Sequence, residues 1–261
     1  MMNLERIIVG IQGLGLAETA YQNSLAYASE RKQGKSNNNK DNQTDVIIKH
    51  ADIRRSLMNM KSIIEGQRSL AFWVSQQIDV SLNHASQEVK TEADNLVSLM
   101  TPLIKSFFTD IGMEITNDAI QVFGGYGYTK DQGIEQLFRD NRITPIYEGT
   151  NSVQAIDLVY RKILNNKIFD KYISQISNEA KEIGKNKNLN IFAQKFEKYL
   201  ELLNNFTLWL GKKNKISKDD VSSACNDYLK VLGYIGLAHS WLKILKISYE
   251  NKEKNKVFFE D

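Results

Sequence analysis

A single carboxylate, Glu148, lies between an aromatic residue and a glycine in the stretch IYEGTN. Ile146 and Tyr147 supply an apolar wall beside it, and Gly149 permits close approach of a ligand. The backbone amides around Glu148 are suited to polarising a carbonyl group. A lone acid just before a helix is by default an exposed side chain that favours the helix dipole. The combination with its neighbours favours a general base that removes a carbon-bound proton.

A glycine-rich stretch, QVFGGYGY, occupies residues 121–128 upstream of this carboxylate. It is not the dinucleotide-binding fingerprint, because the glycine spacing differs and the preceding segment has a helical pattern. Taken alone, such a stretch is more often the end of a helix than a ligand loop. Its glycines would nevertheless let backbone amides approach a pyrophosphate, and the amide of Gln121 can bond a neighbouring polar group.

The composition is that of an ordinary globular protein of one large or two small domains. The 261 residues are 42% hydrophobic and 25% charged. The net charge of +3 is the balance of 34 basic and 31 acidic residues, which is too mild and too mixed to indicate a nucleic-acid partner. The two prolines are few enough to favour long helices.

One cysteine, Cys225, excludes an intramolecular disulfide and indicates a reducing compartment, so we expect a cytoplasmic protein. No apolar run approaches the roughly 20 residues that span a bilayer, and the N-terminus lacks the pattern of a signal peptide. His50, His84 and His239 are far apart and lack the spacing of zinc ligands. We therefore expect no metal site, and Cys225 is most simply a small packed residue.

Apolar residues recur at helical three-and-four spacing along most of the chain. The segments with this spacing are residues 7–28, 53–78, 93–119, 153–163, 172–183, 192–210 and 221–245. A polar, glycine-led segment at residues 34–43 predicts a mobile surface loop, and Ser217 is a candidate N-cap. No alternating strand pattern is present. The sequence therefore predicts an all-α protein of two helical units, residues 1–165 and 166–261.

Residues 121–154 resemble the C-terminal signature of acyl-CoA dehydrogenases, in which Gln-x-x-Gly-Gly is followed by Arg-Asp and then Tyr-Glu-Gly-Thr. The stretch NLERIIVGIQGLGLAETAYQNSLAYASERKQG resembles the first helix of that family's C-terminal domain. The segment QGLGLAETAYQNSLAYA and the helical pattern after Ile163 resemble the longer subgroup of the family that includes 3-methylmercaptopropionyl-CoA dehydrogenase. The resemblance is firm to about residue 165 and looser beyond.

The resemblance implies the fold of one part of a three-part protein. Family members have an N-terminal helical domain, a middle β domain and a C-terminal four-helix domain. This chain is similar only to the last, so we expect a four-helix-bundle-like domain followed by a smaller helical extension. The N-terminal and middle β domains are absent from the matched residues.

By the same resemblance, Glu148 is the base that removes the α-proton of an acyl-CoA while the β-carbon gives a hydride to FAD. The residues implied to contact FAD are Arg31, Gln33, Gln121, Gly124, Gly125, Thr150 and Asn151. In the family, the positions of Arg31 and the glycine run serve the FAD of a partner subunit. The residues implied to contact the substrate are Asn3, Arg6 and Gly149.

Two positions depart from the family pattern. QGKSNNN stands where many relatives have Phe-Gly, and Ser152 stands where many have Gln. Two functions remain open: a dehydrogenase portion completed by a separately supplied N-terminal portion, or a catalytically silent helical oligomerisation module. The implied partners are an acyl-CoA, further copies of the chain or the complementing portion, and electron-transfer flavoprotein as electron acceptor, with no nucleic acid and no membrane span.

Overall fold

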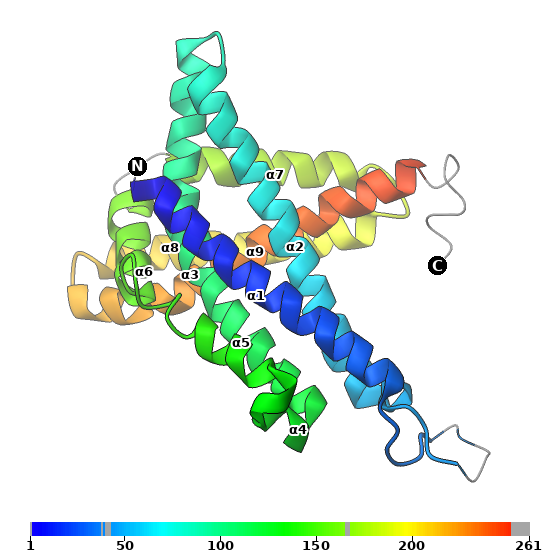
Figure 1. The fold of residues 1–261 in the computed structure, drawn as a ribbon. Helices are drawn as coiled ribbons and strands as arrows, with labels where there is room; N and C mark the ends of the chain where they lie inside the picture. The colour runs from blue at the N-terminus through cyan, green and yellow to red at the C-terminus, as the bar shows by residue number, and fades with distance from the viewer. Residues whose placement is uncertain (1, 38, 40–42, 165–167, 252–261) are drawn as a thin grey trace. The chain divides into compact units, whose positions relative to one another are not determined.

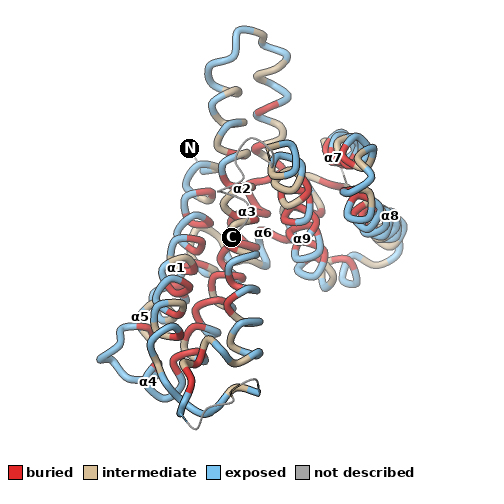
Figure 2. Tube along the Cα trace, turned by 90° about the vertical axis from the view of Figure 1, so that its right-hand side faces the viewer, coloured by how far each residue is buried: buried red, intermediate tan, exposed pale blue. Residues whose placement is uncertain are grey.

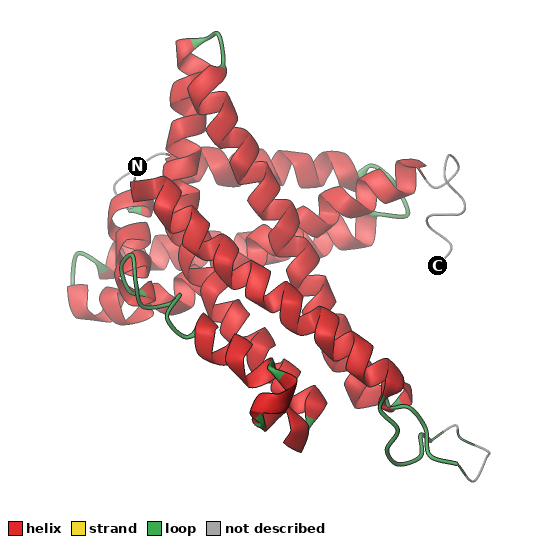
Figure 3. Cartoon of the chain, in the orientation of Figure 1, coloured by secondary structure: helices red, strands yellow, loops and turns green. Residues whose placement is uncertain are grey.

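The computed structural model describes residues 2–37, 39, 43–164 and 168–251. Within these ranges the regular elements are helices, and an isolated antiparallel bridge joins Lys32 to Val46 (Figure 3). The all-α prediction is therefore confirmed. The predicted boundary between residues 165 and 166, and part of the predicted loop at 34–43, lie outside the described residues.

The helices follow one another along the chain (Figure 1). In chain order they are α1 (Met2–Glu30), η1 (Ile47–Lys49), α2 (Ala51–Asn83), α3 (Gln87–Phe123), α4 (Gly125–Tyr128), η2 (Lys130–Gln132), α5 (Ile134–Asn141), α6 (Asn151–Ile156), η3 (Asp157–Ile163), α7 (Ile168–Gly184), α8 (Asn190–Lys213) and α9 (Lys218–Asn251). Each periodic segment of the sequence lies in one of them, except residues 153–163, which span α6 and η3. The sequence did not predict α4, nor that η3 is π-helical.

The chain divides into two compact units, and the first comprises Met1–Arg68 and Ile104–Asn151. In this unit α1 touches α3 through glycines, because a β-carbon on Gly10 would lie 2.6 Å from Ile104 Cγ2. A β-carbon on Gly112 would lie 2.9 Å from the Gly13 carbonyl oxygen. Buried residues accordingly line the facing sides of these helices (Figure 2).

The second unit comprises Ser69–Leu103 and Ser152–Asp261. Its helices α7, α8 and α9 pack around aromatic side chains, among which Tyr172 and Tyr228 are fully buried. The Phe169 and Phe206 rings lie 6.4 and 5.3 Å from the Tyr228 ring, centroid to centroid. The predicted N-cap is confirmed, since the Asp220 amide donates to Ser217 Oγ at 3.3 Å just as α9 begins.

Among the described residues, α3 is long and apolar enough to cross a membrane by length and composition. In its most apolar window 78% of the residues are buried inside the protein. A core helix of a globular protein passes the same test.

Candidate active site

The predicted base lies on a tight turn after α5. The Asn151 amide donates to the Pro145 carbonyl at 3.1 Å and closes the turn. Within it Glu148 has φ 54° and Gly149 has φ 88°, and Glu148 is the non-glycine residue with positive φ in the described part of the chain. A side chain held at positive φ costs of order 1–3 kcal/mol and persists only where its surroundings enforce it.

The side chain of Asn151 binds this turn to α3 from within the first unit. Its Oδ1 accepts a hydrogen bond from Lys105 Nζ at 2.9 Å. Its Nδ2 donates to Asp110 Oδ1 at 2.7 Å, to Thr109 Oγ1 at 3.0 Å and to the Ser106 carbonyl at 3.2 Å. The carboxamide predicted to contact FAD is thus already engaged by α3.

Lys105 is a fully buried cation on α3, and the sequence reasoning missed it. Burial is the largest influence and lowers the pKa of its ammonium to about 8. The carboxylates of Asp110 and Glu148 act in the opposite direction, and Arg6 adds to the lowering. A lysine inside the apolar run LIKSFF was the available signal, because a charge among buried neighbours needs a reason.

The N-terminal part of α1 faces the same turn. The Tyr147 hydroxyl donates to Gln12 Oε1. Arg6 is half-buried, and its Nε is buried without a hydrogen-bond partner. Asn3 lies one turn earlier on the same helix face and is also half-buried. The structure therefore brings Arg6 and the Glu148 turn together, as their predicted roles require.

A second group of predicted residues gathers where α1 ends. The Arg31 guanidinium lies over the Tyr126 ring at 5.2 Å from its centroid, and its Nε is buried without a hydrogen-bond partner. The helix α3 ends as predicted, with the Gly124 amide donating to the Gln121 carbonyl and Gly124 at φ 61°. This places Arg31 beside the glycine-rich turn.

The glycines of that turn differ in what they do. A β-carbon on Gly124 or Gly125 would meet nothing within 4 Å. On Gly127 it would lie 2.7 Å from the Ile120 carbonyl oxygen, so Gly127 is required by packing, which the sequence reasoning missed. An orphaned arginine nitrogen beside open glycine backbone fits the pyrophosphate of FAD in its chemistry.

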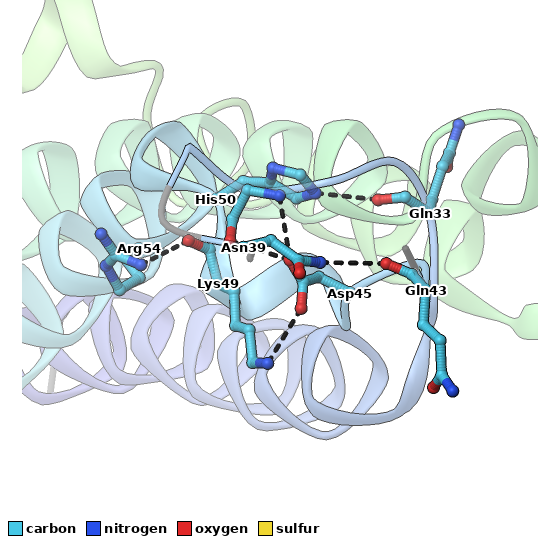
Figure 4. Close-up of polar contacts among 8 residues, drawn as sticks. Gln33, Asn39, Gln43, Asp45, Lys49, His50 and Arg54 are labelled. Atoms are coloured by element: carbon cyan, nitrogen blue, oxygen red, sulfur yellow. Dashed lines mark hydrogen bonds and ion pairs between the residues drawn. The ribbon is translucent and has the colours of Figure 1, made fainter. Parts of the chain in front are cut away.

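Gln33 belongs to a loop network centred on Asp45 (Figure 4). The Asp45 carboxylate accepts from Ser36, from Asn39 Nδ2 at 2.7 Å and from Lys49 Nζ at 2.9 Å. The Lys49 hydrogen bond is the largest cause of a pKa for Asp45 well below its usual range. The Gln33 carbonyl accepts a hydrogen bond from His50 Nε2 at 2.8 Å. The exposed side chain of Gln33 points away from the network (Figure 4). The described part of the predicted mobile loop is thus held by hydrogen bonds.

The predicted cofactor residues fall into two groups at opposite ends of α1. Thr150 and Asn151 lie in the Glu148 turn near Arg6, whereas Arg31 and the glycine-rich turn lie beyond the last turn of the helix. From residue 6 to residue 31 is 25 steps, which at about 1.5 Å each is roughly 37 Å. This separation agrees with the family expectation that the two groups contact the FAD of different subunits.

The described histidine and cysteine residues outside this site that could take part in catalysis or metal binding include His239 and Cys225, and both are buried in packing contacts. His239 is buried, and its Nε2 lies 2.9 Å from Glu179 Oε2. Cys225 is fully buried, and burial raises the pKa of its thiol to about 11, which disfavours the reactive thiolate. Among the residues with described positions, no group of three His, Cys, Asp or Glu side chains could hold a metal ion.

Comparison with known proteins places these features in a family. Residues 1–164 match the family described as acyl-CoA dehydrogenase, C-terminal domain. The chain is 39% identical over 166 residues to 3-methylmercaptopropionyl-CoA dehydrogenase of Ruegeria pomeroyi, covering 64% of this chain and 28% of that protein. It is 35% identical over 178 residues to a butyryl-CoA dehydrogenase of Syntrophomonas wolfei, covering 67% of this chain and 29% of that protein.

Solved structures share the fold over nearly the whole chain. An acyl-CoA dehydrogenase of Bacillus anthracis, complexed with FAD, has a TM-score of 0.76 at 20% identity and covers 98% of this chain and 44% of its own. Caenorhabditis elegans ACDH-11, complexed with C11-CoA, has a TM-score of 0.73 at 20% identity and covers 100% and 47%. This chain thus spans less than a third of the two curated relatives and less than half of the two structures. Since the family match takes in residues 1–164 of 261, the chain belongs to the acyl-CoA dehydrogenase family and carries its C-terminal helical domain.

Proposed function

We propose that the chain is the C-terminal portion of an FAD-dependent acyl-CoA dehydrogenase that forms a double bond between the α- and β-carbons of an acyl-CoA thioester. The observation that carries the proposal is the backbone of Glu148, held at φ 54° in the turn between Pro145 and Asn151. Strain at a single non-glycine residue is concentrated at functional sites, and here it falls on the residue predicted to be the base.

Glu148 would take the proton from the α-carbon, and the electron pair of that bond would form the new carbon–carbon double bond. The reaction needs an acceptor for the hydride that leaves the β-carbon, and FAD supplies it when bound. The α-proton is weakly acidic, so the thioester carbonyl must be polarised, and the amide of Glu148 is the proposed donor. Gly149 leaves room for the substrate beside this amide, and Asn3 and Arg6 are the proposed contacts from α1.

The proposed FAD contacts of this chain are of two kinds. Arg31 would hold a phosphate by a charge-assisted hydrogen bond, and the Gly124–Gly125 backbone would supply amides. Gln33, Gln121 and Thr150 carry exposed side chains and are proposed as edge contacts. The roughly 37 Å between the two groups supports an assembly in which two copies contribute to each FAD site.

The proposed reaction needs the family's N-terminal and middle β domains as well, and this chain spans less than a third of its curated relatives. Electron-transfer flavoprotein is the proposed acceptor of the electrons, by resemblance to the family. The cytoplasm is the proposed location, because a single cysteine is typical of a reducing compartment.

A second candidate is a catalytically silent oligomerisation module. It is favoured by an apolar groove of about 660 Å³ between α8 and α9, in the second unit. Aromatic and aliphatic residues line it, and the aromatic ones include Phe192, Tyr199, Tyr234 and Trp241. Exposed apolar surface of this kind favours association with another copy.

One experiment separates the two candidates. The purified chain alone should be colourless and inactive, because a few phosphate contacts give little net free energy of FAD binding once the cost of association is subtracted. It should also self-associate through its exposed apolar surface. Adding a protein that supplies the N-terminal and middle β domains should restore flavin absorbance and acyl-CoA oxidation together. Stoichiometric FAD in the chain alone would contradict the role given to the missing domains, and a complemented assembly without oxidation would favour the silent module.

A further inference from the structure

The turn that carries Glu148 is held to α3 by a polar arrangement that is buried at its centre. Asn151 closes the turn through its backbone amide and fixes it to α3 through every polar atom of its carboxamide. The Ser106 hydroxyl also donates to the Asn151 carbonyl, at 3.4 Å. The left-handed backbone of Glu148 therefore lies within a segment that Asn151 fixes to α3.

Lys105 is the charged member of this arrangement, and its location is unfavourable by itself. The side chain is fully buried, and its ammonium donates to a neutral carboxamide. A buried cation loses hydration that a neutral acceptor restores only in part. Such a residue contributes less to stability than an apolar side chain of similar length, so its presence calls for another explanation.

The charges that face Lys105 indicate what that explanation is. Asp110 on its own helix, Glu148 on the turn and Arg6 on α1 all act on its ammonium. The lysine therefore lies within electrostatic reach of the predicted base and of a predicted substrate contact. Its ammonium also donates to Asn151, the residue that closes the Glu148 turn, so Lys105 is placed where it can hold that turn.

We propose that Lys105 is a positioning residue for the α-proton base: through Asn151 it holds the Glu148 turn in its reactive conformation. This assignment rests on the proposed function of Glu148. It also makes Asn151 part of the support of the turn, in addition to any contact with FAD.

The test uses Lys105→Met, which keeps side-chain length and removes the ammonium. Lys162→Met is the matched control, because Lys162 donates to Ser98 in the other compact unit. In the full-length chain, amide hydrogen exchange at residues 146–150 should accelerate about tenfold or more in Lys105→Met, as loss of a charged hydrogen bond would cause. Exchange in α1 and in α7 to α9 should not change, and the control should behave like the wild type.

The second arm uses the chain complemented with the missing domains and FAD, with butyryl-CoA as substrate. Lys105→Met should lower the flavin reduction rate about tenfold to a hundredfold, with the half-saturating substrate concentration within about threefold of the wild type. The wild-type pH profile should contain an ionisation near pH 8 that the variant lacks.

Unchanged exchange at the turn, or acceleration spread evenly over the first unit, would overturn the proposal. A variant with a normal rate and weaker substrate binding would overturn it as well. A wild-type assembly that never reduces flavin would instead reject the proposed function, while the exchange measurement would still decide whether Lys105 holds the turn.

Discussion

The surroundings of the two ends of α1 differ, although each end has an arginine, Arg6 or Arg31, whose Nε is buried without a hydrogen-bond partner. Near its start, Lys105 is fully buried and Asn151 uses its whole carboxamide inside the chain. At its other end, Arg31 has a buried Nε without a hydrogen-bond partner, and Gly124 and Gly125 face open space. The difference supports the proposal that contacts within this chain position Glu148, whereas a bound ligand would complete the end that carries Arg31, Gly124 and Gly125.

The largest expected effect separates chemistry from cofactor binding. Glu148→Gln keeps the size of the side chain and removes the base, so flavin reduction by acyl-CoA in the complemented assembly should fall about a hundredfold to ten-thousandfold. FAD content, measured from the flavin absorbance, should stay at the wild-type level. A variant that loses FAD and activity in parallel would show that the two ends are not independent.

A smaller effect concerns the contribution of buried Lys105 to the free energy of unfolding. The unfolded chain keeps the Lys105 proton to about pH 10.4, whereas the folded chain keeps it only to about pH 8. Between these values the unfolded state binds more protons, so this group makes the free energy of unfolding rise with pH, by at most about 3 kcal/mol. Urea denaturation from pH 7.5 to 10.5 should show this rise in the wild type and in Lys162→Met, but not in Lys105→Met. The same pH dependence of the free energy of unfolding in all three proteins would contradict a lowered pKa for Lys105 in the folded chain.

At the end of α1 that carries Arg31, substitutions should change the affinity for FAD. Arg31→Ala should weaken FAD binding to the complemented assembly by about 1.5–3 kcal/mol, the value of a charge-assisted hydrogen bond. Arg161→Ala is the control, because Arg161 is exposed and pairs with Asp157 on its own helix. Fluorescence titration with FAD measures both. Equal affinities for the two variants would remove Arg31 from the site.

The smallest effect distinguishes the glycines. Gly127→Ala should destabilise the chain by about 1–3 kcal/mol, because its β-carbon would meet the Ile120 carbonyl oxygen at 2.7 Å. Gly125→Ala should change stability by less than about 0.5 kcal/mol, since nothing lies within 4 Å of its β-carbon. Thermal unfolding compares them. Equal destabilisation would show that the turn is packed rather than open.

The helices could be predicted from the sequence because their signals are local. Apolar spacing located every long helix, Gly124 marked the end of α3, and Ser217 marked the start of α9. The contact of α1 with α3 through Gly10 and Gly112 could not be predicted, since it depends on which helices meet. The positions of glycines along one helix do not by themselves identify the helix that packs against it.

The site was predictable only where residue type carried the information. Glu148 was located through its neighbours, but its positive φ depends on contacts of Asn151 with α3, more than 40 residues away in sequence. Lys105 has no motif, and its importance follows from burial. Gly127 was overlooked in favour of Gly124 and Gly125, because only the fold shows which glycine is crowded.

The proposed role of Glu148 as the base can be measured by isotope exchange at the α-carbon of the substrate. The complemented assembly is incubated with butyryl-CoA in D₂O, and mass spectrometry follows deuterium at the α-carbon. We expect incorporation with the wild-type chain and a rate of incorporation lower by about a hundredfold or more with Glu148→Gln. Incorporation at the wild-type rate in Glu148→Gln would contradict this role, because another group would then be the base.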